Sequence, residues 1–136
     1  MTKQLIDPPQ LHDGSPFGMS QAAIDTASAT VYISGQIDWD VNNQVSCHTV
    51  EGQLSKALAN LTTVLEASGS SVESLLSLRV YIRGEFGEFT QEIAPILAQY
   101  LGESRSSLTG IGVASLVTPE VLVEIEATAA LIKSLG

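Results

Sequence analysis

The chain has 136 residues, a formal net charge of −9 and a mean hydropathy of +0.22. This length predicts one domain, residues 1–136, with a hydrophobic core of its own. Only six Lys and Arg residues stand against 15 Asp and Glu residues. We expect no nucleic-acid partner, because binding phosphates requires clustered positive charge. No apolar run reaches the roughly 18 residues of a membrane span, and no apolar signal region is visible. We therefore expect a cytoplasmic protein without a membrane partner.

Two strands are predicted after a turn-rich N-terminal segment. Residues 1–16 carry turn-forming Asp, Gly and Pro residues and show no hydrophobic periodicity. A short strand is expected over 17–24. The alternating stretch "TVYISGQID" predicts a second strand, with Val31 and Ile33 on one face and Gln36 on the other. A hairpin is expected to join the two strands.

The clearest helical pattern follows Thr49. In "TVEGQLSKALANLTTVLEASG", apolar residues recur at the three- and four-residue spacing of a helix that buries one face. Thr49 can cap the first turn, and Gly69 supplies a left-handed residue after the last turn. We therefore expect a helix that begins at Val50 and ends just before Gly69.

The middle of the chain predicts a short helical turn, a strand and a second helix. Ser70 and Glu73 have the spacing of a capping box, which marks the start of a helical turn. The strand that follows has apolar residues at every second position from Leu78. Over 86–100, apolar residues return to helical spacing, although Pro95 stands inside this helix, where a proline usually causes a kink.

Two further strands complete the pattern. The first, "SLTGIGVASL", has Gly110 and Gly112 on one parity, and the second, "VLVEIEATAAL", alternates apolar and mostly polar residues. The predicted order is two strands, a helix, a strand, a helix and two strands, which is typical of an α/β domain. If the helices cover only one face of the sheet, we expect the other face to pack on sister subunits in a closed ring.

Three stretches together resemble the YjgF/Rid family, the reactive intermediate deaminases, also called endoribonuclease L-PSP-like proteins. They are "SQAAIDTASATVYISGQID", "EGQLSKALANLTTVLEASGSSVESLLSLRVYIRGEFGEF" and "VASLVTPEVLVEIEATA", within a resemblance from about Pro16 to Ala129. The resemblance implies a single domain with a chorismate-mutase-like α/β fold, a mixed β-sheet and helices packed on one face. It also implies a homotrimer with a barrel-like centre and three clefts between subunits, each binding a small-molecule metabolite.

Members of the deaminase branch hydrolyse enamines and imines, such as 2-aminoacrylate, to 2-keto acids and ammonia without a cofactor. An arginine that holds the substrate carboxylate by two hydrogen bonds suits this chemistry. A side-chain carboxylate that positions water and moves protons suits it as well. The resemblance thus implies no cofactor. No metal is expected either, because no further ligand motif accompanies His12, His48 and Cys47.

The family arginine stands six residues before the alanine of the "VA.L" motif, and in this chain that position is Leu108. Arg105 precedes it by three residues, and an odd shift along a strand reverses the face on which a side chain lies. Imine hydrolysis is therefore expected to be weak or absent. Two interpretations of Arg105 stay open: a solvated loop cation, or a displaced clamp for an anionic ligand that requires a bulge or a loop rearrangement.

Other family positions also differ. The tyrosine of the family's "YSQA" motif is Met19 here, and the polar position four residues after the phenylalanine of its "DF" motif is Ile93. The family carboxylate is retained as Glu124, the first Glu of "VEIEA". Glu124 is the expected catalytic carboxylate, and Arg105 is a further candidate. The expected ligand-binding residues are Met19, Ser34, Gly35, Ile93, Leu108 and Glu124.

Several functions follow as hypotheses. The first is a Rid-family trimer that binds a small, mostly apolar metabolite in its clefts and has little or no deaminase activity. One alternative is a non-catalytic binding or regulatory trimer, and another is an active 2-imino acid deaminase that uses Arg105. Ribonuclease activity, which the family's older name suggests, conflicts with the net charge of −9.

Overall fold

Six β-strands form one mixed sheet in the order β1-β2-β3-β6-β4-β5. The computed structural model describes residues 2–132. β4 and β5 run parallel, and the other neighbouring strands run antiparallel. The strands are β1 (Lys3–Ile6), β2 (Ala22–Asp25), β3 (Thr30–Gln36), β4 (Leu75–Arg83), β5 (Ser107–Val113) and β6 (Val123–Ala130).

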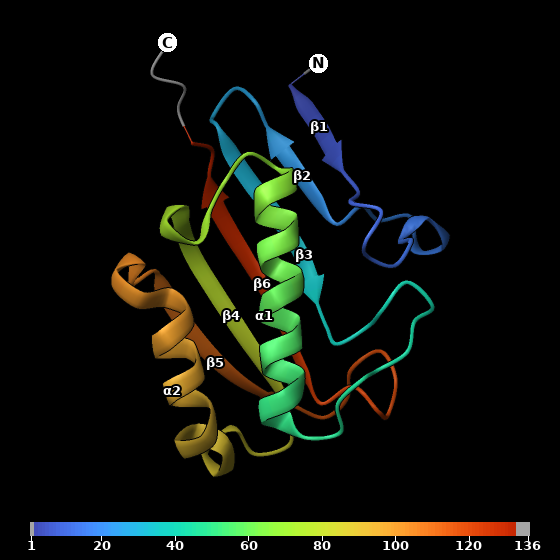
Figure 1. The fold of residues 1–136 in the computed structure, drawn as a ribbon, viewed down its shortest axis with the longest axis vertical. Helices are drawn as coiled ribbons and strands as arrows, with labels where there is room; N and C mark the ends of the chain where they lie inside the picture. Colours follow the sequence, from blue (N-terminus) through green and yellow to red (C-terminus); the bar gives the residue numbers. More distant parts are fainter. Residues whose placement is uncertain (1, 133–136) are drawn as a thin grey trace.

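Two α-helices cover one face of this sheet (Figure 1). α1 (Val50–Ala67) packs on β3 and β6, and α2 (Thr90–Leu101) lies beside α1, towards β5. Leu54, Leu61 and Leu65 of α1 are fully buried against the sheet. Within residues 2–132, the opposite face of the sheet carries no helix. The predicted α/β fold, with a mixed sheet and helices on one face, is confirmed.

The ends of α1 follow the predicted capping. The Thr49 hydroxyl accepts a hydrogen bond from the Gly52 N–H at 3.1 Å, which satisfies one of the free donors of the first turn. Gly69 has a φ of 79°, the left-handed conformation that favours glycine. The predicted capping box at Ser70 does not form, because the Ser70 hydroxyl donates instead to the carbonyl of Ala130 at 2.6 Å.

The N-terminal segment differs from the prediction in two ways. β1 is a strand that pairs antiparallel with β2, although four residues are too few to show a sequence period. β2 begins at Ala22 rather than near Phe17, because Ser15–Phe17 forms a 3-10 turn and Gly18 follows with a φ of 72°. The predicted hairpin between β2 and β3 is confirmed, with Asp25 paired to Thr30.

A bulge in β3 reverses the expected side of Gln36. The register with β6 shifts between Ile33 and Gln36, so one residue is added to β3 relative to its partner. Gln36 is consequently buried and donates a hydrogen bond to the Gln21 side-chain oxygen at 2.9 Å. Strand alternation alone placed Gln36 on the outer face, and this prediction was wrong. Gly35 lies within the bulge, beside the side chain of Glu124 on β6.

The second predicted helix is divided into two parts. Phe86–Phe89 forms a 3-10 turn, and α2 then continues through Pro95. Pro95 has no N–H, so α2 lacks one backbone hydrogen bond in its middle. The inner side of α2 is made by Ile93, Leu97 and Leu101, which are all buried. This apolar row faces the β5 edge of the sheet, where a groove forms.

Candidate functional site

The predicted ligand-binding residues lie on two different faces of the sheet. Glu124 follows the outward parity of β6, between the buried residues Val123 and Ile125. Leu108 of β5 is in parallel register with Leu78, which is buried under the helices. Residues in register on neighbouring strands share a face. Leu108 therefore lies on the helix-covered face, and Glu124 lies on the open face.

Four of the predicted residues gather on the open face. Gly35 and Glu124 line a hollow of about 250 Å³. Met19 and Ser34 line a second hollow of about 320 Å³. Ser34 and Gly35 are consecutive, so the two hollows are neighbours. The first hollow is completed by Tyr81, Leu116 and Glu126.

Glu124 is a half-buried carboxylate held close to the backbone of β3. The bulge brings Gly35 so near that a Cβ at this position would overlap the carboxylate of Glu124. Burial raises the pKa of Glu124, and the charge of Glu126 on the same face raises it further. A carboxyl group with a raised pKa can hold a proton closer to neutral pH, which general acid–base chemistry requires.

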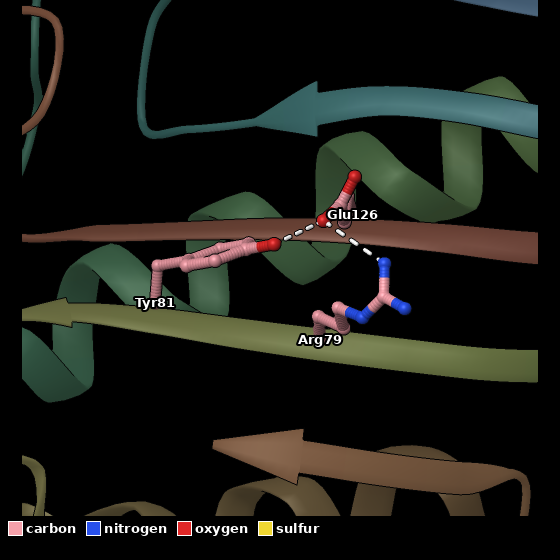
Figure 2. A network of polar contacts seen from close by, with 3 residues as sticks. All are labelled: Arg79, Tyr81 and Glu126. Atoms are coloured by element: carbon pink, nitrogen blue, oxygen red, sulfur yellow. Dashed lines mark hydrogen bonds and ion pairs between the residues drawn. The ribbon is translucent and has the colours of Figure 1, made fainter. Parts of the chain in front are cut away.

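Three side chains beside Glu124 form a polar network on the open face (Figure 2). Glu126 accepts a hydrogen bond from the Tyr81 hydroxyl and forms an ion pair with Arg79, whose Nη1 lies 3.5 Å from Glu126 Oε1. The hydrogen bond to Glu126 is the main reason why the pKa of Tyr81 is raised. Strand parity puts Arg79 and Tyr81 on one face, but the β4–β6 register was needed to identify their shared partner.

Arg83, also on β4, has a structural role. Its guanidinium donates to the carbonyls of Thr118 at 2.8 Å, Val121 at 3.2 Å and Ala114 at 3.4 Å. These contacts hold the segment that connects β5 to β6. Because its donors are directed at backbone carbonyls, Arg83 is not available as a clamp for an anionic ligand.

The remaining predicted residues line a groove between α2 and β5, which we call the α2–β5 groove. Its volume is about 660 Å³, within the range of small-molecule sites in proteins. Ile93 is 1% exposed at the floor of the groove, and Leu108 is 48% exposed at its edge. Arg105 lines the same groove. The sequence left open whether Arg105 lies near Leu108, and in the structure both residues line this groove.

The backbone before β5 explains this placement of Arg105. Gly102–Ser104 forms a 3-10 turn, and Arg105 follows it with a φ of 43°. β5 begins only at Ser107. Arg105 is therefore outside the strand, and the rule that an odd shift reverses the face does not apply to it.

Neither a metal cluster nor a spanning helix is found among residues 2–132. No three His, Cys, Asp or Glu side chains in this range lie close enough to hold a metal ion. His12 packs edge-to-face on Trp39, with ring centroids 5.1 Å apart, and burial lowers its pKa. In the same range, no helix has the length and apolar character needed to cross a membrane.

Comparisons with known proteins give consistent results. A family model described as endoribonuclease L-PSP matches residues 16–131. A RutC family protein from Pyrococcus horikoshii is 30% identical over 115 residues, which are 84% of this chain and 88% of that protein. A 2-iminobutanoate/2-iminopropanoate deaminase from Dermatophagoides farinae is 28% identical over 102 residues, 74% of this chain and 77% of that protein.

Two solved structures illustrate the likeness in fold. YyfB from Yersinia pestis, described as a protein of unknown function of the conserved Rid protein family, is 34% identical with a TM-score of 0.71. The comparison covers 96% of this chain and 100% of that chain. Yeast Mmf1 is 22% identical with a TM-score of 0.84 and the same coverage, a similarity of fold alone.

Proposed function

The chain belongs to the YjgF/Rid family, and we propose that it binds a small metabolite in clefts between the subunits of a homotrimer. One observation carries this proposal. The residues expected to bind the ligand are divided between two faces of the sheet, with Glu124 on one face and the α2–β5 groove on the other. This division supports a site that is completed by a second copy of the chain, whose open face would meet the groove.

The two faces are chemically complementary. The open face offers the carboxyl group of Glu124 next to the polar Ser34 and the small Gly35. The α2–β5 groove offers an apolar wall and one cation, Arg105. The open face also exposes large side chains, with Leu5 57% and Tyr32 55% exposed. Packing against sister subunits would remove this apolar surface from water, and a closed trimer does so with one repeated interface.

Imine hydrolysis would place a specific demand on this cleft. Water adds to the imine carbon while one of its protons moves to the nitrogen, which gives a carbinolamine. The hydroxyl proton then moves to the nitrogen as the carbon–nitrogen bond breaks, so that ammonia leaves and a keto group remains. Glu124 would accept the proton from water and return it to the departing nitrogen. The substrate carboxylate would need a guanidinium beside it, and Leu108 stands where the family carries that arginine. We therefore propose that deaminase activity is weak or absent.

A second candidate is an active 2-imino acid deaminase in which Arg105 holds the substrate carboxylate. It is favoured by the position of Arg105, which lines the same groove as Leu108. The similarity to a protein named 2-iminobutanoate/2-iminopropanoate deaminase also supports it. A non-catalytic binding or regulatory trimer is the third candidate, and it requires no activity from Glu124.

The candidates are separated by the hydrolysis of 2-aminoacrylate generated in situ. We expect little activity in the native protein and at least about a tenfold gain in Leu108→Arg, because a charged hydrogen bond to the substrate contributes about 1.5–3 kcal/mol. Val117→Arg is the matched control. Val117 is 48% exposed, as Leu108 is, and it lines neither the hollow beside Glu124 nor the α2–β5 groove. Native activity that disappears in Arg105→Ala would establish the second candidate instead.

The assembly is tested separately by light scattering. We expect a particle of three chains of 14.3 kDa each. A monomer at micromolar concentration would contradict the shared cleft. If the trimer forms but neither native protein nor Leu108→Arg hydrolyses the imine, the non-catalytic candidate is preferred.

A further inference from the structure

The α2–β5 groove is long and is lined by small side chains. Its α2 side carries Ala94 and Ala98 above the buried Leu97. α2 spans 12 residues, and a rise of about 1.5 Å per residue gives a length of roughly 17 Å. The shortness of the two alanines leaves the volume of about 660 Å³ open along this length. The groove therefore suits an elongated ligand.

One end of the groove is cationic and has an unsatisfied polar group. Within residues 2–132, the Arg105 guanidinium forms no hydrogen bond or ion pair. This distinguishes it from Arg79 and Arg83, which have partners in the chain. Ser106 lines the groove next to Arg105, and its hydroxyl group is buried and has no hydrogen-bond partner in the described residues. Buried polar groups without partners are rare and call for an explanation, and a bound anion at this end would supply one.

The other end of the groove is closed by an aromatic ring. The tip of the Phe86 ring lies over Gly110, so that a Cβ at Gly110 would overlap it. Phe86 and Gly110 both line the groove. The absence of a side chain at Gly110 thus lets Phe86 lie against β5, where it limits how far a ligand can extend from Arg105.

We infer that the α2–β5 groove binds an elongated monocarboxylate. The carboxylate lies on Arg105 and the hydrocarbon chain runs along α2 towards Phe86. This inference rests on the proposed function, because the groove is one half of the proposed cleft. A single guanidinium matches one carboxylate in geometry and charge. A phosphate dianion is disfavoured, because among residues 2–132 no second cation lines the groove and the chain has a net charge of −9.

The test is calorimetric titration of the native protein with butanoate, hexanoate, octanoate, decanoate and dodecanoate, and with the primary alcohols of the same lengths. We expect carboxylate affinity to rise by up to about fourfold for each added methylene, until the chain reaches Phe86. Arg105→Gln is expected to weaken carboxylate binding at least about tenfold and to leave alcohol binding unchanged.

Three further variants define the site. Lys56→Gln removes one exposed cation on α1, away from the groove, and is expected to bind carboxylates like the native protein. Ala98→Trp fills the groove from an exposed position and is expected to block both series. Phe86→Leu is expected to make room for a longer ligand, so that affinity continues to rise over more methylene groups than in the native protein. Thermal melting of each variant verifies that it is folded.

The outcomes distinguish this inference from the proposed function. If alcohols bind as tightly as carboxylates, or if Arg105→Gln binds carboxylates normally, the carboxylate site is wrong and the shared cleft is unaffected. If neither series binds the folded trimer, the inference is overturned, while the shared cleft is judged by light scattering and by the imine assay. Binding that depends on Arg105, on chain length and on Ala98 supports the inference.

Discussion

The open face around Glu124 and the α2–β5 groove are built by different means. On the open face, polar side chains from β4 and β6 are satisfied by one another, as Glu126 is by Arg79 and Tyr81. In the groove, apolar side chains line an unfilled volume, and Arg105 has no partner within residues 2–132. The side chains of the first region contact one another, whereas those of the second line an open groove.

This difference follows from the local structure of each region. Neighbouring antiparallel strands place outward side chains about 5 Å apart, where they contact one another directly. A helix packed beside an edge strand is separated from it by whatever side chains lie between, and Ala94, Ala98 and Gly110 are short. Strand pairing therefore produces a closed polar network, whereas small residues at a helix–strand contact produce a groove.

The largest expected effect tests whether the groove's floor belongs to the core. Ile93 is 1% exposed, so Ile93→Ala should lower the free energy of unfolding by about 2–5 kcal/mol, through lost burial and a new cavity. Leu108→Ala, at a position that is 48% exposed, should change it much less. Urea denaturation of the two variants measures both values. Equal effects would mean that Ile93 is not part of the core and that the groove is deeper than described.

A smaller effect tests the network of the open face. Tyr81→Phe removes the hydrogen bond to Glu126 and should destabilise the protein by about 0.5–1 kcal/mol, a modest value because the side chains are partly exposed. Tyr32→Phe is the control on the same face, because no hydrogen bond of the Tyr32 hydroxyl is found within residues 2–132. A Tyr81→Phe protein as stable as the control would show that the network does not stabilise the fold.

The smallest effect is the pH dependence caused by Glu124. Its pKa is raised in the folded state by burial, so the folded protein binds this proton more tightly than the unfolded chain does. The stability from protonated Glu124 is present below the ordinary pKa of a glutamate and is lost as pH rises through the raised value. Glu124→Gln should remove that part of the pH dependence. Identical stability–pH profiles of the two proteins, measured by urea denaturation, would contradict the raised pKa.

Much of the fold was predictable because it depends on local patterns. The helix from Val50, its Thr49 cap and the β2–β3 hairpin follow from residue spacing and from side-chain hydrogen bonds over a few residues. β1 was missed because four residues carry no measurable period. Gln36 was placed on the wrong face because a bulge arises from pairing with β6, which lies far away in the sequence.

The candidate site was predictable only in part. Glu124 was identified from a motif and from strand alternation, and its outward position on β6 follows from the same alternation. The same alternation places Glu126 beside it. The close approach of Gly35 depended on the bulge in β3, and the contacts of Tyr81 and Arg79 with Glu126 depended on the β4–β6 register. The sequence left the relation of Arg105 to Leu108 open, because it depends on the backbone before β5. The 3-10 turn there places Arg105 outside the strand, so the parity argument does not apply to it.

The sequence by itself determined the elements, the apolar face of each and the chemical types available to a site, because these are properties of residues a few positions apart. The tertiary structure decided which face each candidate residue joins and which partners it meets. Those outcomes depend on strand register, on one bulge in β3 and on one turn before β5. Contacts between distant segments select these features, and no short stretch of the chain encodes them alone.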